Sequence, residues 1–115
     1  MHELSIAMSI VEIAEQEAAS RGYTHVNAVH LRLGLLSGIV KEALLSSYEM
    51  ACVSTPLEGS RLLIDEVPVE ILCPNCTGPQ RVQSIQWMAC SECGAPPLEV
   101  VRGKELEVVA LEIQE

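Results

Sequence analysis

The chain has 115 residues, of which 49% are apolar, and its 7 basic and 16 acidic side chains give a formal net charge of −9. This length fits one compact domain with a small lobe. Its apolar runs are shorter than the roughly 18 to 20 residues that cross a bilayer, and its first residues lack the basic region of a secretory signal. An acidic chain also repels nucleic-acid phosphates. We therefore expect a cytoplasmic protein with neither a membrane nor a nucleic acid as partner.

Two helices and a strand are predicted in the first half of the chain. Apolar residues recur at three- and four-residue spacing from Leu4 to Ala19, which predicts an amphipathic helix, and Arg21-Gly22 supplies its stop. Residues from Val26 to Leu35 alternate between apolar and polar, as in a half-buried strand. A second helix is predicted from Val40 to about Cys52.

The second half predicts two more strands around a segment of different composition. Arg61 to Leu72 is rich in branched apolar residues and is predicted as one strand, with Pro68 at an edge or an exit from the sheet. Cys73 to about Pro97 is rich in proline and cysteine, and we expect it to bury no core of its own. The last strand follows Gly103, with a bulge near Val109 where the apolar phase slips.

This order predicts an α+β fold with two helices packed on a three-stranded mixed or antiparallel sheet. The cysteine-rich segment is an inserted lobe similar to a zinc ribbon. The expected domains are residues 1–71 plus 103–115 and residues 72–102. Cys52 is expected to be a small buried hydrophobe, and His25 and His30 to be surface or cross-strand side chains.

Four cysteines form two C-x-x-C pairs, Cys73 with Cys76 and Cys90 with Cys93, separated by thirteen residues. This spacing is typical of a zinc site in which four thiolates leave no open position, so the metal is structural. A disulfide pair or free thiols are the alternatives. Iron is a further alternative, because sulfur-only tetrahedral sites accept either metal. The two C-x-x-C pairs also resemble those of rubredoxin, a one-iron electron carrier.

The first three residues offer a second set of metal ligands. The Met1 amine, the backbone nitrogen and imidazole of His2 and the Glu3 carboxylate suit a square-planar divalent ion. Such nitrogen-rich tetragonal geometry favours Ni²⁺ or Cu²⁺ over Zn²⁺. The alternative is that His2 is frayed and that Glu3 only serves the dipole of the first helix.

The Met1-His2-Glu3-Leu4-Ser5 start on an amphipathic helix, followed by the element order above and the two C-x-x-C pairs, resembles the HypA family of hydrogenase maturation nickel chaperones. The resemblance spans nearly the whole chain. It implies nickel at Met1, His2 and Glu3, and structural zinc at Cys73, Cys76, Cys90 and Cys93. No histidine follows His30, whereas some family members have histidines beside the zinc cysteines.

The resemblance further implies a metallochaperone that inserts Ni²⁺ into the large subunit of [NiFe]-hydrogenase with a HypB-type GTPase as partner. We expect metal transfer and no catalysis, because the sequence shows neither a nucleophile–base pair nor a phosphate-binding loop motif. Whether urease also receives the metal and whether the protein is a homodimer stay open. The alternative functions are a zinc-ribbon interaction module without nickel transfer and a rubredoxin-like electron carrier.

Overall fold

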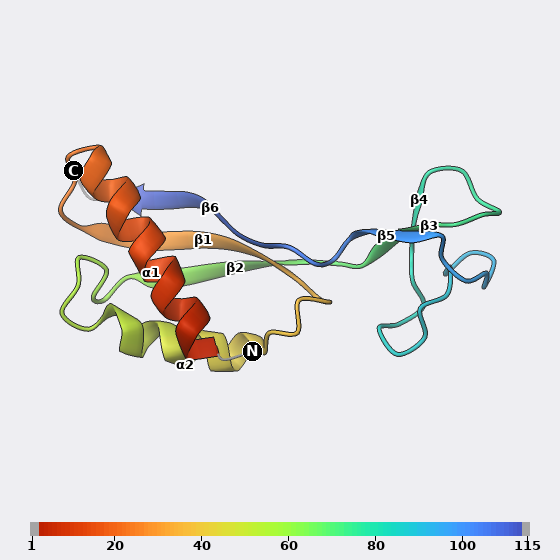
Figure 1. Ribbon diagram of the computed structural model, residues 1–115, viewed down its shortest axis with the longest axis horizontal. Coiled ribbons are helices and arrows are strands. Elements are labelled where there is room, and N and C mark those ends of the chain that lie inside the picture. Colours follow the sequence, from red (N-terminus) through yellow and green to blue (C-terminus); the bar gives the residue numbers. More distant parts are fainter. Residues whose placement is uncertain (1–2, 114–115) are drawn as a thin grey trace. The chain divides into compact units, whose positions relative to one another are not determined.

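The computed structural model describes residues 3–113. In chain order the elements are α1 (Glu3–Ser20), β1 (Val26–Gly34), α2 (Lys41–Cys52), β2 (Arg61–Val67), β3 (Glu70–Leu72), β4 (Pro79–Arg81), β5 (Glu99–Arg102) and β6 (Leu106–Ile113) (Figure 1). Within the described residues, neither helix is long and apolar enough to cross a membrane.

The chain divides into two compact units. Unit 1 comprises Met1–Leu31, Ile39–Asp65 and Glu107–Glu115, and unit 2 comprises Arg32–Gly38 and Glu66–Leu106. The predicted domains are residues 1–71 plus 103–115 and residues 72–102. They are predicted as parts with separate functions, and this functional division stays a prediction.

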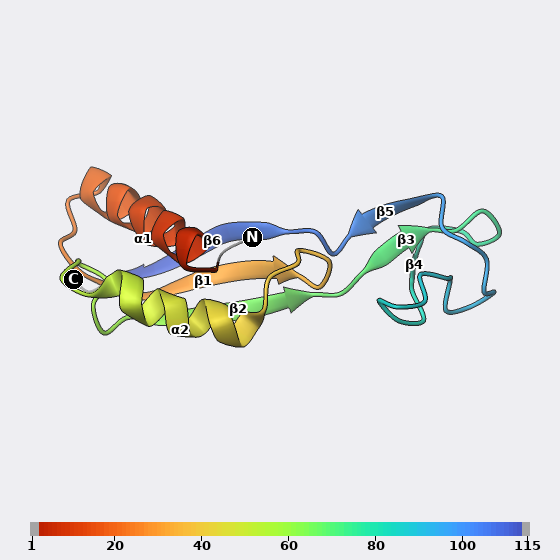
Figure 2. The same cartoon turned by 60° about the horizontal axis from the view of Figure 1, so that its bottom comes forward.

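Unit 1 contains both helices and most of a three-stranded sheet with the strand order β2-β1-β6. Figure 2 shows β1 and β2 running in the same direction and β6 in the opposite one, so the sheet is mixed. In the sequence α2 lies between the parallel strands β1 and β2, because two parallel strands need a long crossover connection, which is usually a helix. The predicted α+β class is confirmed.

The core of unit 1 lies between the helices and the sheet. The buried residues of α1 recur at three- and four-residue spacing, as an amphipathic helix requires; they are Ala7, Ile10, Val11, Ala14 and Ala18. They pack with Leu31 of β1 and with Leu44 and Tyr48 of α2. The helix ends where the N–H groups of Gly22 and Tyr23 bond to the carbonyls of Ala19 and Ala18, which confirms the predicted stop.

The last strand changes phase where the sequence predicts. Val108, Leu111 and Ile113 pack against the core of unit 1, whereas Val109 and Ala110 between them are exposed. In a regular strand every second residue would face the core along the whole length. Here the inward-facing position shifts by one residue between Val108 and Leu111.

One predicted strand is wrong in its extent. Arg61 to Leu72 forms two strands in different sheets, β2 and β3, with Pro68 between them. Proline lacks the N–H that would continue the ladder, so the chain leaves one sheet there and enters another.

Unit 2 has a small sheet and core that the sequence did not predict. The strand order is β4-β3-β5, with both outer strands antiparallel to β3. Val69, Ile71, Cys73 and Cys90 are buried together, and Cys76, Val82, Met88, Ala95 and Val100 are among the partly buried residues against them. The cysteine-rich segment therefore has no core of its own, as expected, but it contributes two buried cysteine side chains to a core that it shares with β3 and Val69.

Within unit 2 two backbone segments approach so closely that one position requires glycine. The N–H of Gly34 donates to the carbonyl of Glu105 over 2.7 Å, and that of Leu36 donates to the carbonyl of Gly103 over 2.7 Å. A Cβ atom on Gly34 would lie 2.1 Å from the Gly103 oxygen, well inside van der Waals contact.

Candidate metal centre

The first C-x-x-C pair follows directly from the end of β3. Strand pairing places Leu72 opposite Pro79, so Cys73 begins the connection that turns back into β4. The backbone N–H of Asn75 donates to Cys73 Sγ over 3.4 Å. This contact folds the chain around the sulfur and brings Cys76 back toward the same point.

The second pair is held beside the first by backbone bonds that extend the β4 ladder. Val82 forms an antiparallel bridge with Cys90, and the N–H of Ser91 donates to the Arg81 carbonyl over 2.9 Å. The N–H of Gly94 donates to the Cys90 carbonyl over 2.9 Å and closes the second turn. Both pairs therefore present their sulfurs to one point.

The four sulfur atoms lie within 4.8 Å of one another, and their residues are the one group of three or more potential metal-ligating residues within 3–113. Cys73 Sγ is 3.3 Å from Cys93 Sγ, and Cys76 Sγ is 3.9 Å from the sulfurs of both Cys90 and Cys93. A tetrahedral zinc site with bonds of about 2.3 Å places its sulfurs about 3.8 Å apart. The cluster is therefore suited to Zn²⁺, with every ligand position taken by the chain.

The electrostatics of the cluster favour one thiolate before metal binds. The backbone N–H of Ala95, followed by the Cys73 thiol, lowers the pKa of Cys93 to about 7. The hydrogen bond with Cys73, together with desolvation, raises the pKa of Cys76 to about 12. A metal that binds here must therefore displace the proton of Cys76, and its affinity rises with pH.

Asn75 is a supporting residue that the sequence analysis missed. Besides its backbone bond to Cys73, its side-chain Nδ2 lies 4.0 Å from Cys93 Sγ, so one residue contacts a sulfur of each pair. Donors to a metal-bound sulfur orient it and stabilise its negative charge. Its position inside the first C-x-x-C pair is the signal that could have identified it.

The predicted nickel site lies largely outside the described residues. Met1 and His2 are not described, and Glu3 is the first residue of α1. Glu3 is half-buried, and its carboxylate accepts a hydrogen bond of 3.5 Å from the N–H of Val40, the N-cap residue of α2. The Glu3 carboxylate therefore lies at the N-terminal ends of both helices, where their dipoles favour a negative charge.

The remaining singled-out residues lie in unit 1. Cys52 is 3% exposed, which confirms it as a buried residue, and its Sγ lies 3.9 Å from the Ser60 hydroxyl. His30 Nε2 lies 2.7 Å from a carboxylate oxygen of Glu112, which confirms a cross-strand role between β1 and β6. His25 is half-buried and lies outside the four-cysteine cluster.

Comparison with known proteins adds to this geometry. A family model described as hydrogenase/urease nickel incorporation, metallochaperone, hypA matches residues 1–113. The chain belongs to the HypA family. The HypA maturation factor of Roseiflexus sp. is 47% identical over 115 residues, which span the whole of this chain and 94% of the relative. That of Geobacter sulfurreducens is 41% identical and covers 99% of this chain and 100% of its own length.

Two solved structures share the fold. One is described as the solution structure of HypA protein and has a TM-score of 0.72 at 22% identity, covering 99% of this chain and 97% of its own. The other is the Ni metallochaperone HypA from Helicobacter pylori, with a TM-score of 0.66 at 22% identity over 98% of this chain and 97% of that one. The HypA fold, a small mixed sheet with two helices and a four-cysteine lobe, is the fold of this chain.

Proposed function

We propose that this protein is a nickel metallochaperone that binds Ni²⁺ at its N-terminus and delivers it during maturation of [NiFe]-hydrogenase. The observation that carries the proposal is the family match across residues 1–113, which includes the Met1-His2-Glu3 start together with the four cysteines. Nickel is the cargo here, so the site that holds it must also release it.

The proposed nickel ligands are the Met1 amine, the backbone nitrogen and imidazole of His2, and the Glu3 carboxylate. Two adjacent nitrogens on one short segment close a five-membered chelate ring, which suits the tetragonal geometry of Ni²⁺. Glu3 lies where two helix N-termini produce positive potential. Its negative charge offsets that potential, which otherwise disfavours a cation beside it.

The proposed zinc role is structural. With four sulfur ligands from the chain, the centre has no open position for a substrate. The proposed division of labour gives residues 1–71 plus 103–115 to nickel binding and residues 72–102 to the zinc-held lobe. Cys73, Cys76, Cys90 and Cys93 hold the lobe, and Met1, His2 and Glu3 carry the cargo.

The proposed activity is ligand exchange and not catalysis: donors on a receiving protein displace the amine and the imidazole. The proposed partners are a HypB-type GTPase, which supplies any energy from GTP, and the hydrogenase large subunit. A homodimer in which a second chain completes the nickel shell is the further arrangement to test. The proposed compartment is the cytoplasm, where cysteine thiols stay reduced.

The test is nickel titration of zinc-loaded protein and of two histidine variants. His2→Ala removes a proposed ligand, whereas His25→Ala removes a half-buried histidine outside the proposed site. We expect His2→Ala to lose nickel binding and His25→Ala to keep it, with one zinc per chain in both. Equal nickel binding by the two variants would refute the N-terminal site. If the wild-type protein binds zinc but no nickel, the proposed function is refuted and the alternative function, a zinc-ribbon interaction module, is supported.

A further inference from the structure

Strand β6 is an edge strand of its sheet. It is the last strand in the order β2-β1-β6, so among the described residues it has a neighbouring strand on the β1 side alone. A strand edge of this kind presents a row of N–H and carbonyl groups to which another extended chain can bond. Natural proteins cover or protect such edges, which makes an open one informative.

A groove of about 510 Å³, lined by both apolar and charged residues, runs along this edge. Its lining comes from the second half of α1 with Tyr23, and from Val108, Val109, Ala110, Leu111 and Ile113 of β6. Neighbouring strand residues point to opposite faces. A groove lined by four consecutive residues of β6 therefore follows the edge of the strand and not one face of the sheet.

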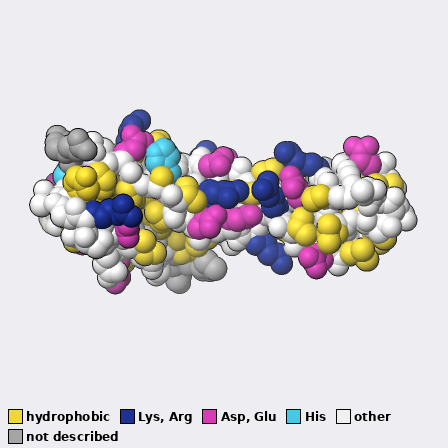
Figure 3. Space-filling model, turned by 90° about the horizontal axis from the view of Figure 1, so that it is seen from above, with side chains coloured by type: hydrophobic (Ala, Val, Ile, Leu, Met, Phe, Trp, Pro, Cys, Tyr) yellow, Lys and Arg dark blue, Asp and Glu magenta, His cyan; other side chains and the backbone are white. Residues whose placement is uncertain are grey.

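Two half-exposed aliphatic side chains line the groove. Ile13 of α1 is 51% exposed and Val109 of β6 is 50% exposed. Two charged residues also line the groove, and they pair with each other: Arg21 Nε lies 2.7 Å from a carboxylate oxygen of Glu17. Figure 3 views the molecule from the side on which β6 lies and shows hydrophobic side chains among charged ones there. The side chains of Ile13 and Val109 are the apolar contacts that the groove offers to an added strand.

The charge of unit 1 restricts what can bind. It carries eleven acidic and three basic side chains, a formal charge of −8, whereas unit 2 carries five acidic and four basic ones. A basic segment is therefore attracted to unit 1 and an acidic one repelled.

The same charges argue against a second copy of this chain in the groove. In the antiparallel register that pairs all of β6 with itself, Glu107 of each copy faces Glu112 of the other. Like charges directly opposite on paired strands are destabilising. Each copy would also bring its own charge of −8 to the interface.

We propose that the groove between α1 and β6 binds an extended segment of a partner protein in which apolar residues alternate with Lys and Arg. The segment adds a strand to the free edge of β6, its apolar side chains contact Ile13 and Val109, and its cations meet the acidic surface of unit 1. This proposal uses none of the nickel ligands. It can therefore fail while the proposed function holds, and the proposed function can fail while this proposal holds.

The probe is a labelled, capped heptapeptide, Lys-Val-Arg-Ile-Lys-Val-Arg, titrated into zinc-loaded protein by fluorescence anisotropy. Two control peptides separate strand addition from charge attraction. One has the same composition with its apolar residues clustered at one end, and the other has Glu in place of every Lys and Arg. Nuclear magnetic resonance of the ¹⁵N-labelled protein maps the contact.

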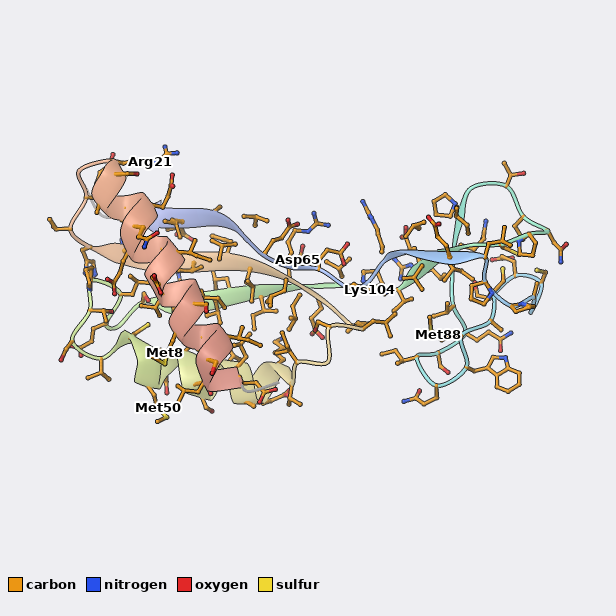
Figure 4. All side chains as sticks on the ribbon, viewed as in Figure 1. Met8, Arg21, Met50, Asp65, Met88 and Lys104 are labelled. Carbon is orange, nitrogen blue, oxygen red and sulfur yellow. The ribbon has the colours of Figure 1, made fainter. Side chains whose placement is uncertain are left out.

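Two protein variants have matched controls. Ile13→Ser and Val109→Ser each remove a half-exposed side chain from the groove. Met8→Ser removes one that is 58% exposed on the same helix, and Val53→Ser one that is 61% exposed after α2. Figure 4 shows Met8 on α1 near α2, away from the end of the helix where Arg21 lies. Because all four positions are exposed, loss of folding does not confuse the comparison.

We expect the alternating peptide to bind, with amide shifts along β6 and the second half of α1. Ile13→Ser and Val109→Ser should each weaken it by about tenfold, which corresponds to about 1.4 kcal/mol, and the two controls by less than about twofold. No binding, equal binding of the clustered peptide, or equal loss in all four variants would overturn the proposal. So would self-association that Val109→Ser abolishes, because the occupant would then be a second copy.

Discussion

Removal of zinc is expected to unfold unit 2 and to leave unit 1 folded. The fully buried aliphatic side chains of the small core are Val69 and Ile71, and each stabilises the fold by about 1.5–3 kcal/mol. Structural zinc contributes about 10–16 kcal/mol to domains of this kind. The metal therefore dominates the stability of unit 2. Unit 1 has its own core and contains none of the four ligands.

A single substitution gives this prediction a magnitude. Cys93→Ser removes one of four sulfurs; an equal share of the zinc free energy is about 2.5–4 kcal/mol, or about 100- to 1000-fold in zinc affinity. Cys52→Ser is the matched control, because Cys52 lies in unit 1 and its replacement hydroxyl has Ser60 as a partner. It should keep one zinc per chain.

Two spectroscopic signals separate the units. The single tryptophan, Trp87, lies in unit 2 between the two C-x-x-C pairs, whereas both helices lie in unit 1. A chelator added to the wild type, or Cys93→Ser at low zinc, should lower the fluorescence anisotropy of Trp87 and leave the helical circular dichroism in place. Loss of both signals together, or of neither, would refute the reasoning that zinc specifically stabilises unit 2.

Three further predictions concern packing, pH and nickel. Gly34→Ala places its methyl against backbone and should cost about 3 kcal/mol in urea unfolding, whereas Gly38→Ala, in open space at φ +79°, should cost about 1 kcal/mol. Burial raises the pKa of Tyr48 and of Cys52 above their unfolded values. Stability should therefore be complete below about pH 8.5 and decline as pH rises further; Tyr48→Phe should flatten the upper part of that decline, and an unchanged slope would contradict the assignment. Nickel affinity should rise with pH, because the amine and the His2 imidazole must lose protons, and a pH-independent affinity would exclude both as ligands.

The long elements could be predicted from the sequence because each carries several turns of periodic apolar residues. The buried positions of α1, from Ala7 to Ala18, show the spacing that predicted them. The metal cluster could be predicted for a different reason: two C-x-x-C pairs separated by thirteen residues are a spacing typical of a zinc site. That the four sulfurs form one cluster could be predicted without knowing how the strands of unit 2 pair.

Unit 2 could not be predicted in detail because its strands are too short to show a period. β3, β4 and β5 have three or four residues each, and β3 pairs with β5 from the far end of the cysteine-rich segment, with Ile71 opposite Val100. Pro68 was correctly identified as an interruption, but a strand period cannot indicate that a chain changes sheets there. The contact of Glu3 with Val40 joins two helix ends far apart in sequence, which no local pattern reveals.

The central claim is that nickel binds at the free N-terminus while zinc holds the lobe. The most direct measurement is a nickel titration of zinc-loaded protein with its native start beside the same protein with Gly-Ser added ahead of Met1. The extension keeps every side chain and moves only the amine away from His2. We predict that the native form binds nickel with a Kd of about 1 μM, or about −8 kcal/mol, and that the extended form loses this binding with one zinc per chain in both. Equal nickel binding by the two forms, or none by either, would contradict the account.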